Sequence, residues 1–374
     1  MIYLDHNATT PVAPEVAQAM EPYWQDQFGN PSSGYPLGRA AKRALEEARS
    51  QVAKLLGCQP AEVIFTSGGT ESNNMVIKGV ARSLGNKGRH MITTSIEHPA
   101  ITNPCLSLQS QGYDVTFLPV DKTGCVDPLQ VKETIRPSTI LISVMHANNE
   151  VGTIEPISEI GAIAREAGVL FHTDAAQSAG KIPARVSDLN VDLLSLAGHK
   201  MYAPKGVGAL FARNGLTMEP FMHGAGQEGG RRAGTENVMF AVALGKACEV
   251  ACEKMSQDAE RLRRLRDRLH SNLAKDVPGL VLNGHPEKRL PNTLNISLPG
   301  IEGAKLLNAL PEICASTGAA CHDRAMTISH VLAAMQTPEE VARGAIRLTL
   351  GRRNTEAEVD LAAKMILAAY HGLK

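Results

Sequence analysis

The sequence predicts an α/β protein with one large domain, built on a mainly parallel sheet, and one smaller α+β domain. Short apolar runs alternate with helix-like segments between residues 90 and 196, as they do in proteins with parallel sheets. At 374 residues the chain is also too long for one ordinary core. We therefore expect a large domain over 15–255 and a small domain made of 1–14 and 256–374.

The first elements are an extended segment, two helices and a short strand. Residues 1–14 are turn-rich, and helices are expected over 14–27 and 39–56, the second with charges of alternating sign. A strand at 63–66 then leads into SGGTESNN and a helix from Met75.

The SGGTESNN stretch is typical of a phosphate-binding turn. Gly68 and Gly69 let the backbone approach an anion. Thr70 and Ser72 add hydroxyl groups beside the free N–H groups at a helix start. Because Ser-Gly-Gly also makes ordinary turns, this stretch predicts a phosphate site only in combination with other residues.

Polar side chains follow the expected strands of the large domain. These strands are the apolar runs at 90–94, 115–120, 140–145, 169–171 and 191–196. In an open α/β sheet, the carboxyl ends of the strands are where ligands bind. We expect one site there, and its polar candidates are His98, Asn148, Asn149, His172, Asp174, Gln177, His199 and Lys200.

Asp174 and Lys200 are the pair that indicates a cofactor. Pyridoxal phosphate needs a lysine amine for its Schiff base and a carboxylate that keeps its ring nitrogen protonated. Each residue alone has an ordinary alternative, because Asp174 could cap the helix that follows and Lys200 could be a surface lysine. Lys205, in a Pro-Lys-Gly turn, is a rival amine. The prediction of this cofactor therefore depends on the combination.

The C-terminal third predicts one long helix and a small α+β unit. The helix is expected over 237–273, where it would link the two domains. It follows the glycine-rich stretch GQEGGRRAGTEN, whose arginines and Thr235 could reach an anionic group, including one in a neighbouring subunit. The other expected elements are strands at 294–298 and 345–350 and helices at 303–310 and from Thr355.

Cys321 and Arg347 are candidates for substrate chemistry. The neighbours of Cys321 favour an exposed loop, and His322 and Arg324 could lower the pKa of its thiol. Cys314, inside an apolar run, is expected to be a packing residue. Arg347 is the one charged residue of an apolar strand, and a buried arginine normally needs an anionic partner. The carboxylate of an amino-acid substrate would serve as that partner.

The composition excludes several classes of partner. Lys+Arg and Asp+Glu both number 38, so no net field favours nucleic acid or an anionic membrane. The sequence shows no transmembrane span and no signal peptide. The seven cysteines are odd in number and include no C-x-x-C pair, so no metal site is expected and a reducing cytoplasm fits best.

Several motifs together resemble the pyridoxal-phosphate-dependent cysteine desulfurases and the related selenocysteine lyases. They are SGGTESNN, IEHPAI, NNEVG, HTDAAQSAGK, AGHKMYAPKG, GQEGGRRAGTEN and STGAAC followed by SHVLAAM. The resemblance runs nearly end to end, from YLDHNATTP to AIRLTLGR. It implies the fold of the class V aminotransferases, which is fold type I of the pyridoxal-phosphate-dependent transferases. It also implies a homodimer, with the first residues packed onto the small domain.

The resemblance further implies a role for each candidate. Lys200 would bind pyridoxal 5'-phosphate covalently, Asp174 would pair with its ring nitrogen, and Gln177 would bond its ring oxygen. His98 would stack on the ring, although a histidine that only bonds within its loop is the alternative. The remaining implied roles are phosphate binding by Gly69, Thr70, His199 and Thr235 (the last from the second subunit), substrate binding by Asn149 and Arg347, and sulfur transfer by Cys321.

The implied reaction removes sulfur from L-cysteine and gives L-alanine and a persulfide on Cys321. An acceptor or scaffold protein would then take the sulfur, as in iron–sulfur cluster biogenesis. His322 directly after the cysteine resembles the selenocysteine lyases, so L-selenocysteine is an alternative substrate. Separately, Ala197 stands where many desulfurases have serine, so one hydroxyl group to the phosphate is missing. The sequence also leaves open an ordinary aminotransferase and a non-enzymatic scaffold subunit.

Overall fold

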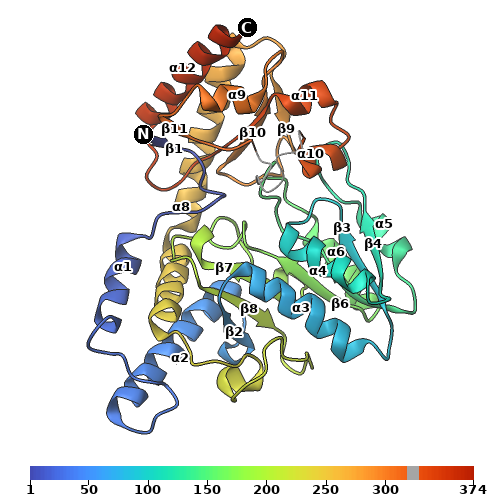
Figure 1. Cartoon of the computed structure of the whole chain (residues 1–374), viewed down its shortest axis with the longest axis vertical. Coiled ribbons are helices and arrows are strands. Elements are labelled where there is room, and N and C mark those ends of the chain that lie inside the picture. Colours follow the sequence, from blue (N-terminus) through green and yellow to red (C-terminus); the bar gives the residue numbers. More distant parts are fainter. Residues whose placement is uncertain (318–327) are drawn as a thin grey trace.

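A seven-stranded sheet lies at the centre of the larger part of the protein, whose computed structural model describes residues 1–317 and 328–374 (Figure 1). All neighbouring strands are parallel except the pairs that include the strand at 208–212. The predicted mainly parallel sheet is therefore confirmed. In spatial order the strands are β2 (Val63–Thr66), β8 (Gly208–Ala212), β7 (Leu193–Ala197), β6 (Leu170–Asp174), β5 (Thr139–Ser143), β3 (His90–Thr94) and β4 (Asp114–Leu118).

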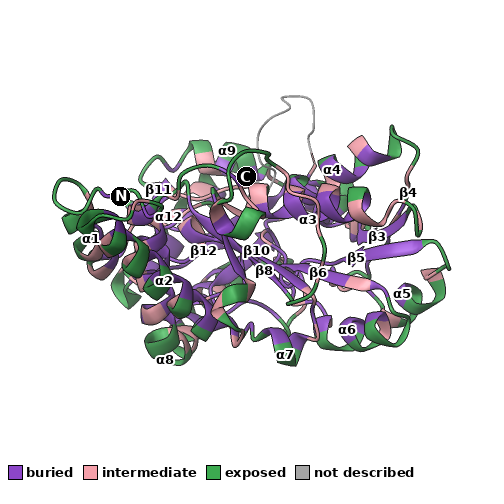
Figure 2. Ribbon diagram, turned by 90° about the horizontal axis from the view of Figure 1, so that it is seen from below, coloured by how far each residue is buried: buried purple, intermediate pink, exposed green. Residues whose placement is uncertain are grey.

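Helices cover both faces of this sheet, so its strands are buried on both sides (Figure 2). In β2, Ile64 packs into the core on one face, while Val63 and Phe65 pack into the core on the other. Burial on both faces explains why the strands are continuous apolar runs in the sequence. The helices of this part are α1 (Pro14–Met20), α2 (Pro36–Leu56), α3 (Gly69–Leu84), α4 (Pro99–Gln109), α5 (Pro128–Thr134), α6 (Ile157–Glu166) and α7 (Val186–Leu189).

The long helix α8 (Val238–Asp276) connects the two parts of the protein (Figure 1). Its 39 residues span roughly 58 Å at the usual rise per residue. Leu244 and Cys248, near its start, pack into the same core of the large sheet as Val63 and Phe65. Leu265 and Leu269, further along, pack into a separate apolar core. The predicted linking helix is confirmed, and the domain boundaries 15–255 and 256–374 stay a prediction.

The second core belongs to a smaller α+β unit. Its antiparallel sheet has the order β12 (Ala345–Thr349), β10 (Thr293–Ser297) and β9 (Val281–Asn283). The N-terminal strand β1 (Ile2–Tyr3) pairs in parallel with β11 (Ile313–Cys314), so the start of the chain lies in this unit, as the resemblance implied. The helices of this unit are α9 (Gly303–Asn308), α10 (His330–Ala334), α11 (Glu339–Arg343) and α12 (Glu356–Leu373).

Two helices differ from the prediction at their ends. The helix expected over 14–27 stops at Met20 and continues as a short 3₁₀ turn, Glu21–Tyr23, because Pro22 has no N–H to continue the α-helical pattern. Helix α3 begins at Gly69 and not at Met75, because the polar SGGTESNN stretch itself forms its first turns.

Candidate active site

The carboxyl ends of three neighbouring strands bring the predicted polar residues together. Asp174 ends β6, and Lys200 follows β7 in a 3₁₀ turn, Gly198–Lys200. Asn149 follows β5 on the other side of β6. The charge of Asp174 partly opposes the lowering of the pKa of Lys200 and of His98 by burial, so its carboxylate lies within electrostatic range of both side chains.

Lys200 lies against the N-terminal segment. Its amine donates hydrogen bonds to the backbone oxygens of Asn7, at 2.6 Å, and Ala8, at 2.7 Å. Burial and the positive charge of Arg347 lower the pKa of Lys200 to about 8, against the partial opposition of Asp5 and Asp174. An amine with this pKa is partly neutral near neutral pH and can act as a nucleophile.

The rival amine, Lys205, lies apart from these contacts. Its side chain is exposed in the turn between β7 and β8. The partly buried Lys200 is therefore the better candidate of the two lysines.

Asp174 is held by donors on both carboxylate oxygens. Oδ2 accepts from Nδ2 of Asn73 at 2.6 Å, and Oδ1 accepts from the N–H of Ala176 at 2.9 Å. The bond from Ala176 caps the turn that follows β6, so capping accounts for Oδ1. It does not account for Oδ2, which is bonded to Asn73. Asn73, one turn into α3, was not among the predicted residues.

His98 begins α4 and lies at the edge of the site. Its Nδ1 accepts the N–H of Ala100 at 3.1 Å, which leaves the proton of the neutral ring on Nε2. Part of the residue is open to solvent, yet desolvation lowers its pKa; Asp174 opposes this shift, and Lys200 and His330 reinforce it. The ring is therefore held mainly neutral.

The loop that carries His98 is fixed by Glu97, which sequence reasoning missed. Glu97 is fully buried, and its Oε1 accepts from Oγ1 of Thr94 at 2.8 Å and from the N–H of Met145 at 2.9 Å. Burial raises its pKa to about 8. His172, by contrast, was predicted as a site candidate but lies inside β6, bonded to Ser143 at 2.8 Å and Ser195 at 3.0 Å, as a buried core histidine.

The start of α3 has the features of an anion site. The N-cap, Gly68, has a φ of 149°, which favours glycine, and it has no side chain that could satisfy the N–H groups of the first turn. A Cβ on Gly69 would lie 3.3 Å from the Cβ of Ala197, so this turn packs directly against the end of β7. Thr70 is exposed there.

His199 and Thr235 are the other two predicted phosphate ligands. The Nδ1 of His199 lies 3.2 Å from Oγ1 of Thr9, and burial together with the charges of Lys200 and Lys205 lowers its pKa to about 4. Thr235 is exposed in the loop before α8, and its role in a second subunit stays a prediction.

Asn7 connects most of the site, and no pattern in the sequence indicates this role. Its backbone oxygen accepts from Nε2 of Gln177 at 2.9 Å as well as from Lys200. Its side chain reaches both parts of the protein. The side-chain partners are Lys181 at 3.0 Å, the backbone oxygen of Asn149 at 3.1 Å, Thr293 at 2.9 Å and Asn292 at 3.1 Å.

Arg347 is buried in β12, and its anionic partner in the structure is a carboxylate of the chain itself. The sequence predicted an anionic partner but suggested the carboxylate of a substrate. Its Nη2 donates to Oδ1 of Asp5 at 2.7 Å, and its Nη1 donates to the backbone oxygen of Asn149 at 3.1 Å. Its Nε has no hydrogen-bond partner among the residues that the structure describes.

The predicted sulfur-carrying residue, Cys321, lies outside the described residues, as do His322 and Arg324. The flanking elements are β11 and α10. Ser329 is the N-cap of α10, since its Oγ accepts from the N–H groups of Val331 and Leu332.

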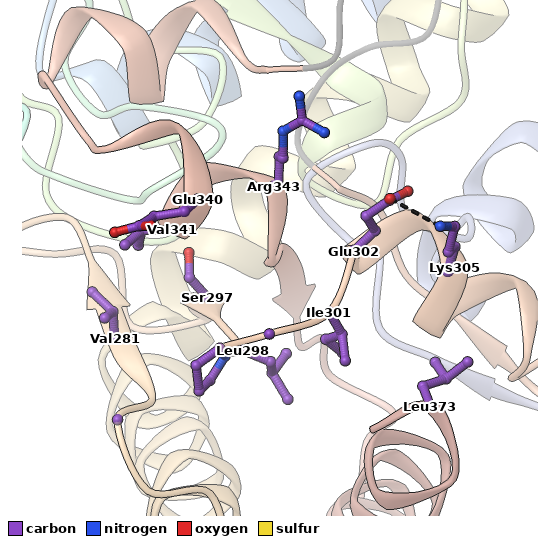
Figure 3. Close-up of a pocket in the computed structure, with 13 residues that line it drawn as sticks. Val281, Ser297, Leu298, Ile301, Glu302, Lys305, Glu340, Val341, Arg343 and Leu373 are labelled. Atoms are coloured by element: carbon purple, nitrogen blue, oxygen red, sulfur yellow. Dashed lines mark hydrogen bonds and ion pairs between the residues drawn. The ribbon is translucent and has the colours of Figure 1, made fainter.

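A pocket of about 570 Å³ lies elsewhere, in the smaller unit between the end of β10, α11 and the last turn of α12 (Figure 3). It is lined by Leu298, Ile301 and Arg343 and by an ion pair between Glu302 and Lys305 at 2.9 Å. None of the predicted site residues in 1–317 and 328–374 lines it, so we do not assign the active site to it. Over the same described ranges, no helix combines the length and apolarity that a membrane span requires.

Comparison with known proteins identifies the family. The model of the family described as aminotransferase class-V matches residues 2–361. The protein named cysteine desulfurase IscS of Dictyoglomus turgidum is 49% identical over 361 residues, which cover 96% of this chain and 92% of that protein. Its namesake of Methanosarcina thermophila is 50% identical over 98% of this chain and 91% of its own. Human cysteine desulfurase is 46% identical over 96% of this chain and 79% of its own.

Solved structures agree with this assignment. A structure described as a NifS-like protein superposes with a TM-score of 0.94 at 39% identity and covers all of both chains. A structure described as SspA in complex with cysteine superposes with a TM-score of 0.85 at 38% identity, over 94% of this chain and 99% of that one. The chain belongs to the class V aminotransferases and, within them, to the cysteine desulfurase family.

Proposed function

We propose that this protein is a cysteine desulfurase that uses pyridoxal 5'-phosphate. It removes sulfur from L-cysteine, forms L-alanine and keeps the sulfur as a persulfide on Cys321. The observation that carries the proposal is the convergence of Lys200, Asp174 and His98, which follow or end β7, β6 and β3 at the same edge of the sheet. The names of the relatives and a neighbour solved with cysteine support the same reaction.

The residues of the site fit pyridoxal 5'-phosphate. Lys200 offers an amine of lowered pKa for the aldehyde, and Asp174 offers a buried carboxylate for the ring nitrogen. His98 supplies a neutral ring beside them. The uncapped start of α3, with Gly69, Thr70 and His199 nearby, suits the phosphate. In a homodimer, Thr235 of the second subunit would add one more phosphate ligand.

When bound, the cofactor supplies an electron sink for bond cleavage at the substrate. The chain itself orients the reactants. Arg347, which bonds to the backbone oxygen of Asn149, would hold the substrate carboxylate, and Asn149 would help to bind it. Asp174 and Gln177 would bond the ring nitrogen and the ring oxygen of the cofactor. Lys200 takes up or releases protons at its amine, which its pKa of about 8 permits near neutral pH.

Cys321 acts as the sulfur acceptor. Its thiolate attacks the substrate sulfur, so an S–S bond forms as the carbon–sulfur bond breaks, and the electron pair and a proton remain with the carbon product, alanine. The persulfide then passes to an acceptor or scaffold protein, for example in iron–sulfur cluster assembly. The sequence features that fit a reducing cytoplasm also fit a cysteine that must stay a thiol between turnovers.

L-selenocysteine is the second candidate substrate, because His322 follows the acceptor cysteine directly. Initial rates on L-cysteine and L-selenocysteine at equal concentration separate the two. A strong preference for L-selenocysteine, with little sulfide formed from L-cysteine, would replace the first proposal by the second.

The proposal is tested by adding L-cysteine and a reductant to the cofactor-loaded protein and measuring sulfide and alanine. Lys200→Ala should lose the covalently bound cofactor, and Cys321→Ala should keep the cofactor but reduce sulfide release to background. Cys252→Ala, which changes an exposed cysteine of α8, is the matched control and should behave like the natural protein. Unchanged sulfide release by Cys321→Ala would remove the proposed role of that thiol.

A further inference from the structure

Lys181 lies beside the site, and the proposed reaction gives it no role. It follows β6 in the turn that begins with Asp174 and Gln177. The residue is partly buried and lines a small cavity of about 20 Å³ together with His6 and Thr10.

The amine of Lys181 bonds to two carboxamide oxygens. It donates to Oε1 of Gln177 at 2.9 Å and to Oδ1 of Asn7 at 3.0 Å. The charged groups that act on it are Lys200 and Arg347, which are both positive, and together with burial they hold its pKa well below the ordinary value. Because no carboxylate of the described residues contributes, an ion pair within 1–317 and 328–374 does not account for a lysine at this position.

These contacts decide which way the carboxamide of Gln177 faces. A carboxamide accepts at one end and donates at the other, whereas a backbone carbonyl only accepts. The Nε2 of Gln177 donates to the backbone oxygen of Asn7 at 2.9 Å, the oxygen that also accepts from Lys200 at 2.6 Å. Lys181 holds the opposite end, Oε1. The donor end of Gln177 is thus turned towards Lys200.

We propose that Lys181 is a positioning residue that locks the carboxamide of Gln177 with its Nε2 donor facing the cofactor site. The inference rests on the proposed function, in which Gln177 bonds the ring oxygen of the cofactor. One hydrogen of Nε2 is used by Asn7, and the other is available to that oxygen. Without Lys181, Oε1 loses its donor and only the backbone oxygen of Asn7 opposes rotation of the carboxamide. A rotated carboxamide would present Oε1, which would repel a negatively charged ring oxygen.

The test is the pH dependence of the visible absorbance of the cofactor-loaded protein. Lys181→Met keeps an unbranched side chain as far as Cε and removes the donor. Since a hydrogen bond to a charged oxygen is replaced by a repulsive contact, the pKa of the bound cofactor should rise by about one pH unit or more. Lys254→Met, which changes an exposed lysine of α8 paired with Glu15, is the control and should leave that pKa unchanged.

A double-mutant comparison shows whether the effect passes through Gln177. Gln177→Ala should raise the cofactor pKa by itself, and adding Lys181→Met to it should cause no further shift. A shift that persists undiminished in the Gln177→Ala background would overturn the inference, as would an unchanged pKa in Lys181→Met. Loss of thermal stability alone would indicate a merely structural role and would also overturn it.

Two outcomes separate this inference from the proposed function. If the natural protein binds no pyridoxal phosphate, the proposed function fails. If it binds the cofactor but Lys181→Met leaves the absorbance titration as it was, only the role of Lys181 fails. Should Lys181→Met not fold, Lys181→Leu, which also lacks the donor to Oε1 of Gln177, takes its place and must raise the cofactor pKa in the same way.

Discussion

The lowered pKa of Lys200 can be measured without any cofactor. With a pKa of about 8, about a quarter of the Lys200 amines are neutral near pH 7.5, whereas about 0.1% are neutral for a lysine with the usual pKa of about 10.5. The reactivity of this amine at that pH should therefore be about two hundred times that expected from the ordinary pKa. Brief reductive methylation of the cofactor-free protein between pH 6 and 10, read out for each lysine by peptide mass spectrometry, gives the titration directly.

Two substitutions should move this pKa in opposite directions. Arg347 is the strongest charged influence that lowers it, so Arg347→Gln should raise the pKa of Lys200 towards its ordinary value. Asp5 opposes that influence, so Asp5→Asn should lower the pKa further. A pKa near 10 in the natural protein would show that the amine is hydrated and not held against Asn7 and Ala8. Shifts of the same sign in both variants would refute the electrostatic explanation.

Two further predictions concern stability. The pKa of Glu97 is raised to about 8, so between about pH 5.5 and 7 the folded state retains a proton that the unfolded state releases; the free energy of unfolding should fall there by up to about 1.4 kcal/mol per pH unit. Glu97→Gln should remove the contribution of Glu97 to this slope in urea titrations at several pH values, while Glu150 and Glu155, whose pKa values burial also raises, keep theirs. Arg49 and Glu228 form a buried ion pair at 2.7 Å, so Arg49→Met should lower the free energy of unfolding, measured in urea, by about 3–5 kcal/mol. Arg82→Met, which breaks the exposed pair with Glu219, should lower it by about 1 kcal/mol or less.

The parts of the site that lie at strand ends were predictable from the sequence. Apolar runs mark the strands of a doubly covered sheet, and a polar residue directly after such a run must lie at the sheet edge. Asp174, Lys200 and Asn149 were found by this rule. The same rule failed for His172, because two serines on neighbouring strands satisfy its ring inside the sheet.

The supporting residues were not predictable, because long-range contacts define their roles. Asn73 reaches Asp174 across 101 positions of sequence, and Asn7 reaches Lys200 across 193. An asparagine near a chain start or in the first turns of a helix has no pattern that distinguishes it from a surface residue. Glu97 had a weak signal, since an acid that directly follows an apolar residue and precedes a candidate histidine is a plausible support for it.

The partner of Arg347 shows how the start of the chain would contribute to the proposed substrate binding. Asp5 reaches this arginine because the N-terminal segment pairs with β12 at Thr349. The pair occupies Nη2 and leaves the buried Nε–H without a partner among the described residues. An unpaired buried donor costs about 1–3 kcal/mol. A carboxylate that entered beside Asp5 would bond this Nε–H and remove that cost, so the arginine can bind an amino-acid carboxylate while Asp5 stays in place.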